Sequence, residues 1–115
     1  MARQQSASER ITEQVTSWPG VKAGPGRRGE FAFMVDGRAI GHLHGNHAAH
    51  FGFPKHVWRE LRAQGRIEPH PVFPHREGLA GRRIEDDADV RDVIELMRLN
   101  YDRVVAAHPI TTEAA

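Results

Sequence analysis

The chain has 115 residues, a formal net charge of +1 with neutral histidines, and no cysteine. This length suits one domain with one core, so we expect residues 1–115 to form a single domain, ordered over about 6–108 between polar tails. Balanced charge predicts no strong field for polyanions, and the lack of cysteine excludes disulfides and thiolate metal sites. No apolar run has the length of a membrane span or a signal-peptide core, so we expect a cytoplasmic protein without membrane partners.

The first elements predicted along the chain are a helix and a meander of strands. Residues 6–9 fit a capping box, and Ile11, Val15 and Trp18 follow on one helical stripe that ends at Pro19-Gly20. Alternating apolar residues and hairpin turns then predict strands at residues 21–23, 30–35, 38–44 and 47–51.

The second half of the chain predicts two more helices and one edge strand. Pro54 suits the first turn of a helix that Gly65 would cap. Residues 66–73 contain two prolines, which restricts them to an edge strand or an extended loop. Next we expect a loop and a last short strand, at residues 74–81 and 82–84. The final helix begins at Asp86 or Asp87 and carries the clearest amphipathic stripe of the chain.

Helices on both sides of a run of strands indicate the fold class. We predict an α+β fold, in which N-terminal, middle and C-terminal helices pack on an antiparallel meander of about four to six strands. The sequence shows no internal repeat and no linker that would divide this unit.

The segment 41–50 holds four of the eight histidines and is the most informative part of the sequence. Gly45-Asn46 is typical of a two-residue hairpin turn, which would pair His44 with His47. Side chains alternate along a strand, so this register predicts a same-face group and an opposite face. The same-face group would be His42, His44 and His47 with Ile40 and Phe51, and the opposite face would carry His50 and Leu43.

Grouped imidazoles indicate either a general base or a metal site. Imidazole titrates near neutrality, and neighbouring imidazoles disfavour one another's protonation, which keeps a neutral base available. A His-x-His pair on one strand also begins many divalent-metal sites, with His47 as a third ligand and His70 as a fourth for Zn²⁺, Fe²⁺ or Mn²⁺. A purely structural role is disfavoured, because β-branched residues would pack better at these positions.

The spacing of these histidines carries a family resemblance. His42-Leu43-His44, then His47, then Gly65 followed five residues on by His70-Pro71, resemble the luciferase domain of fungal bioluminescence. The segment from Val93 to Tyr101 is similar as well, so the resemblance extends over about residues 30–101. The chain is more similar still to small bacterial proteins grouped with that domain, which are unrelated to the flavin-dependent bacterial luciferases.

The resemblance implies an oxidoreductase, a luciferase-like oxygenase with O₂ as co-substrate. The expected partner is a flat phenolic or hydroxylated pyrone of the hispidin type, and a divalent metal stays open as a cofactor. The residues expected to carry the chemistry are His42, His44, His47 and His70. Those expected to bind substrate are Arg38, Phe51, Arg66, Phe73 and Tyr101, beside the histidines and the last helix.

A non-catalytic alternative follows from the predicted fold. A small helix–meander–helix domain also resembles proteins of the YjbR type, which would make this chain a small-molecule or metal-binding module. Nucleic-acid binding is disfavoured, because the sequence has no recognition helix, no basic face and no interleaved aromatic and basic residues. The sequence predicts no particular oligomeric state.

Overall fold

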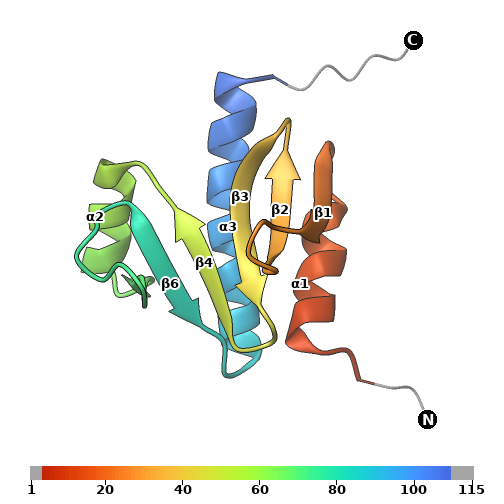
Figure 1. Cartoon of the computed structure of the whole chain (residues 1–115), viewed down its shortest axis with the longest axis horizontal. Coiled ribbons are helices and arrows are strands. Elements are labelled where there is room, and N and C mark those ends of the chain that lie inside the picture. The colour runs from red at the N-terminus through yellow and green to blue at the C-terminus, as the bar shows by residue number, and fades with distance from the viewer. Residues whose placement is uncertain (1–3, 110–115) are drawn as a thin grey trace.

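The computed structural model describes residues 4–109, which form a six-stranded antiparallel sheet and three helices (Figure 1). The predicted α+β class is confirmed, and the expected tails fall largely on residues 1–3 and 110–115, outside the described part. The strands lie in the order β1-β2-β3-β4-β6-β5. The elements are α1 (Ala7–Thr16), β1 (Val21–Pro25), β2 (Phe31–Val35), β3 (Arg38–His44), β4 (Ala48–Gly52), α2 (Lys55–Ala63), β5 (Glu68–Pro69), β6 (Leu79–Arg83) and α3 (Asp87–Ala107).

The helix boundaries follow from local signals in the sequence. In the capping box of α1, the Glu9 amide donates to Ser6 Oγ at 3.1 Å and the Ser6 amide donates to Glu9 Oε1 at 2.9 Å. The α3 helix begins after Asp86, whose carboxylate accepts from the Asp89 amide at 2.9 Å. Gly65, just after α2, has a positive φ of 72°, as its predicted capping position requires.

The β6 strand corrects the prediction for the region before α3. A loop was expected over 74–81 and a last strand at 82–84, but β6 begins at Leu79 and inserts between β4 and β5. Tertiary contacts hold it there: the Phe53 amide donates to the Gly78 carbonyl, and Trp58 Nε1 donates to the Leu79 carbonyl, both at 2.8 Å. The proline-containing β5 lies at the sheet edge, as predicted.

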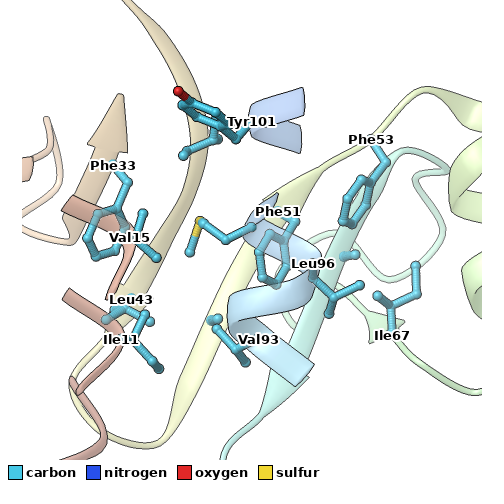
Figure 2. Close-up of a cluster of buried hydrophobic side chains, with 14 of the residues drawn as sticks. Ile11, Val15, Phe33, Leu43, Phe51, Phe53, Ile67, Val93, Leu96 and Tyr101 are labelled. Atoms are coloured by element: carbon cyan, nitrogen blue, oxygen red, sulfur yellow. The ribbon is translucent and has the colours of Figure 1, made fainter. Parts of the chain in front are cut away.

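The core lies between one face of the sheet and the helices α1 and α3. Phe33, Leu43 and Phe51 of the sheet are at most 2% exposed and meet Ile11 and Val15 of α1 and Val93 and Leu96 of α3 (Figure 2). Their burial is the main source of stability in the fold. In Figure 1, α3 passes behind the sheet, so the viewer looks onto the opposite face. None of the helices within residues 4–109 combines the length and apolar character needed to cross a membrane.

Candidate functional site: a histidine cluster on the open face

A bulge in β3 turns His42 and His44 away from the core. Phe33 pairs with Gly41 but Met34 pairs with Ala39, so Ile40 is an extra residue in β3. Ile40 is therefore fully buried, while His42 and His44 lie on the face that α1 and α3 leave uncovered, called the open face below. The prediction that Ile40 shares a face with these histidines was wrong, because the bulge resets the alternation.

Contacts with α3 hold this bulge in place. A Cβ on Gly41 would lie 2.5 Å from Met97 Sδ and 3.0 Å from Phe51 Cδ1, so only glycine lets the strand approach the helix this closely. The buried Asn100 side chain donates from Nδ2 to the carbonyls of Ile40, at 3.2 Å, and Gly52, at 2.8 Å. The helix thus determines which face the histidines occupy.

The hairpin between β3 and β4 differs by one residue from its predicted register. His42 pairs with His50 and His44 pairs with Ala48, so the turn has three residues, 45–47, instead of two. The Ser8 amide donates to Asn46 Oδ1 at 2.8 Å, a contact between distant segments that no local pattern indicates. His47 therefore lies exposed in the turn, and His50 takes the same-face position that was expected for His47.

His50 is the residue that the sequence analysis missed. The signal was present: Ala49, Phe51 and Phe53 alternate as apolar residues, and all three are buried in the core. His50, between them, must then face the other side. Assigning Phe51 to the histidine face hid this alternation.

Four imidazoles meet on the open face. Ring centroids are 5.1 Å apart for His42 and His44, 5.3 Å for His42 and His50, and 4.1 Å for His44 and His50. His70, just after β5, places its ring 4.5 Å from that of His50. We call His42, His44, His50 and His70 the histidine cluster. Three of these four residues, His42, His44 and His70, are among those predicted from the sequence to carry the chemistry.

The surroundings keep much of this cluster uncharged near neutral pH. Burial, followed by the neighbouring imidazoles His44, His70 and His42, lowers the pKa of His50 from 6.5 to about 4. Burial also lowers the pKa of His42, assisted by His44 and His70 and opposed by the carboxylate of Glu30. The pKa of His70 is lowered by burial and by His44. Neutral imidazoles retain a nitrogen lone pair that can accept a proton or bind a metal.

His70 is held by its own loop. The backbone amides of Val72 and Phe73 both donate to His70 Nδ1, at 3.1 and 3.3 Å. The Phe73 ring lies 5.6 Å from the His70 ring at an angle of 36°. Phe73 itself is 41% exposed, so it offers an apolar surface beside the cluster.

A hollow of about 280 Å³ opens next to His50, between β4, β6 and the segment around β5. Pro69 and Pro71 form part of its wall and Gly81 part of its lining. A Cβ on Gly81 would lie 3.4 Å from the Pro69 carbonyl oxygen and 3.5 Å from Pro71 Cδ, which would narrow the hollow. Its volume is near the lower end for ligand pockets, so it suits a small molecule.

Most residues expected to bind substrate lie elsewhere. Phe51 and Tyr101 belong to the core on the opposite face, and the Tyr101 hydroxyl donates to the Pro19 carbonyl at 2.7 Å. The last helix covers that same face, so it does not flank the cluster. Arg38 pairs with Asp36 at 3.2 Å, and Arg66 pairs with Asp92 at 2.7 Å. Phe73 alone of the five contacts a cluster histidine.

Three members of the cluster could hold a metal ion. One nitrogen each of His42, His44 and His50 lies within 4.8 Å of the others. Ligands of tetrahedral zinc at about 2.1 Å are roughly 3.4 Å apart, so small side-chain rotations would complete such a set. This set contains His50 in place of the predicted His47. His70 does not fit as the fourth ligand, because its Nδ1 accepts two backbone amides and the proton of the neutral ring then occupies Nε2.

The comparison with known families agrees with this geometry. The Luciferase domain family matches residues 37–100, more than half of the chain. The chain belongs to the Luciferase domain family. The matched region runs from just before β3 into α3 and contains the whole histidine cluster of this luciferase-family protein. No curated protein and no solved structure matches the chain significantly.

Proposed function

We propose that this luciferase-family protein is an oxygenase that oxidises a flat hydroxylated pyrone or phenol of the hispidin type with O₂. The observation that carries the proposal is the histidine cluster beside the hollow, within the part of the chain that matches the family. Enol oxidation needs a base to take the hydroxyl proton and a recess to hold the ring, and the cluster offers lone-pair nitrogens beside such a recess.

His44 is the residue we assign as general base. Its ring is in contact with those of both His42 and His50, and it is the exposed member of the three, so a ligand can reach it. Its neutral nitrogen would take the proton of the substrate hydroxyl and leave an enolate. The enolate carbon would then form a bond to O₂ with its electron pair, and the resulting peroxide anion would regain the proton from the His44 imidazolium. Atoms and electrons balance without a further reductant.

The residues that line the hollow favour a planar ring compound as the substrate. Two proline rings and an unsubstituted glycine suit the face of a planar ring, and the exposed Phe73 ring offers further apolar contact. Arg83 and Glu68 pair at 3.3 Å and both line the hollow, so its rim carries one positive and one negative side chain. We therefore expect neutral or singly anionic ring compounds to bind in preference to long or highly charged ones.

Oxygen uptake with 3-hydroxyhispidin tests the proposal. The wild-type protein should consume O₂ faster than the uncatalysed reaction, and His44→Ala should lower kcat/KM about 10²–10⁴-fold, the usual effect of a general base. His56→Ala is the matched control, because His56 is exposed on α2, away from the cluster. Emission of light is a weaker test, since it also needs a rigid dry pocket. Oxidation at the uncatalysed rate by folded protein would contradict the proposal.

Metal binding is the second candidate function, and the His42–His44–His50 set favours it. Untagged protein should then contain or take up about one Zn²⁺, Fe²⁺ or Mn²⁺ per chain. His50→Gln should weaken Zn²⁺ binding by at least roughly 10–100-fold, which is already the usual cost of losing a residue that only supports a ligand, whereas His47→Ala should not weaken it. Equal effects of the two substitutions would contradict this ligand set, and no uptake would contradict metal binding.

A further inference from the structure

The loop after β5 determines which nitrogen of His70 carries a proton. An imidazole nitrogen that accepts hydrogen bonds must have a free lone pair, and Nδ1 accepts from both the Val72 and Phe73 amides. In the neutral ring the proton must then be on Nε2. Protonating Nδ1 would set a third N–H group against those two amides, so the loop favours this single neutral form.

His70 thus differs from the other cluster histidines in the hydrogen-bonding character of its free nitrogen. Nε2–H is a donor without a lone pair, and within residues 4–109 it has no hydrogen-bond partner. Its ring is half-buried and lies 4.5 Å from that of His50, which lines the hollow. A half-buried donor next to a residue that lines a recess is suited to binding an oxygen atom of a ligand held beside that residue.

We propose that His70 is the substrate-orienting residue of the cluster: its Nε2–H donates to a carbonyl or enolate oxygen of the ring bound beside His50. The histidines on the sheet then offer nitrogen lone pairs, and His70 on the loop offers an N–H donor whose tautomer is fixed. The proposal rests on the proposed function for the identity of the ligand. The fixed tautomer follows from the loop geometry alone.

NMR of histidine side-chain nitrogens tests the proposal directly. In the wild-type protein at neutral pH, His70 should show the Nε2–H form. Titration with maltol, a small 3-hydroxy-4-pyrone, should shift the His70 Nε2 and Nε2–H signals together with those of His44 or His50. An Nδ1–H form of His70 would overturn the proposal, as would maltol shifts at His44 and His50 without a shift at His70.

Two substitutions separate binding from loop structure. His70→Asn keeps an oxygen that can accept from the Val72 amide, as in an Asx turn, but lacks a donor at the Nε2 position. His70→Gln keeps an N–H at that position but loses the Nδ1 acceptor. We expect the Asn variant to bind maltol about 3–10-fold more weakly, the usual cost of losing a hydrogen bond between neutral groups, and the Gln variant to lose much less.

The opposite order would overturn the proposal. If His70 merely supports its loop, Asn should bind maltol as the wild type does and Gln should be impaired. Amide signals of Val72 and Phe73 report the state of the loop in each variant. Maltol binding without catalysed oxidation of 3-hydroxyhispidin would contradict the proposed function and leave the role of His70 standing. No maltol shift at any cluster histidine would contradict both.

Discussion

Neighbouring residues on β3 and β4 face opposite sides of the sheet and meet opposite surroundings. Leu43 and Ala49 are at most 1% exposed beneath the helices, whereas His44 is exposed on the open face. The core face buries apolar area and the open face gathers imidazoles that repel one another's charge. Stability and chemistry are therefore separated across a single strand thickness, and substitutions on the two faces should affect different measurements.

Truncating the core should give the largest effect. Phe33 is fully buried in the sheet and packs edge-on against Phe31 at 5.4 Å. Phe33→Ala should lower the free energy of unfolding by about 3–5 kcal/mol, through lost burial and the cavity left behind. The exposed His44→Ala should change it by less than about 1 kcal/mol. Urea unfolding measures both, and a similar loss in the two variants would contradict the separation of the faces.

The bulge that joins the two faces should be the next most sensitive point. Gly41→Ala places a Cβ against Met97 Sδ and should cost about 1–3 kcal/mol, as overpacking of a core does. Gly24→Ala in β1 is the matched control, because its Cβ would meet no atom within 4 Å. Equal unfolding free energies for the two variants would mean that the Gly41–Met97 approach does not hold the bulge.

The sequence predicted features that depend on near neighbours in the chain. The capping box at Ser6, the proline-bearing edge strand and the stripe of the last helix all rest on local spacing, and the structure contains each of them. The family resemblance was also visible in the sequence, and residues 37–100 match the Luciferase domain family.

Features that depend on distant contacts could not be predicted. At the bulge Gly41 packs against Met97, and in the three-residue turn Asn46 accepts a hydrogen bond from the Ser8 amide. These two contacts decide which histidines share a face, so the predicted site included His47 and missed His50. The substrate-binding roles predicted for Phe51 and Tyr101 were wrong for the same reason. Both residues lie in the core, whereas the cluster lies on the open face.

The open face should make stability depend on pH. The pKa of His50 is about 4 in the folded protein and ordinarily 6.5, so between these values the unfolded chain binds more protons. The contribution of His50 is complete above about pH 6.5 and is lost as the pH falls toward 4. We expect a loss of about 1–2 kcal/mol, reduced by solvent screening of the open face.

Urea unfolding between about pH 7 and 5.5 measures the upper part of this dependence, where Asp and Glu side chains remain mostly ionised. His42 and His70 have pKa values lowered in the same direction and should add to the loss. His50→Gln should make the profile flatter, whereas His56→Ala on α2 should leave it unchanged. An unchanged slope in the Gln variant would show that His50 is not held uncharged by the cluster.

Oxygen uptake by a pair of hairpin variants tests the central claim most directly. His44 and His47 are three residues apart, but only His44 belongs to the cluster on the open face. With 3-hydroxyhispidin, His44→Ala should lower kcat/KM by about 10²–10⁴-fold and His47→Ala should stay within about 3-fold of the wild type. Equal activity of the two variants, or loss in His47→Ala with His44→Ala unaffected, would contradict a catalytic role for the cluster.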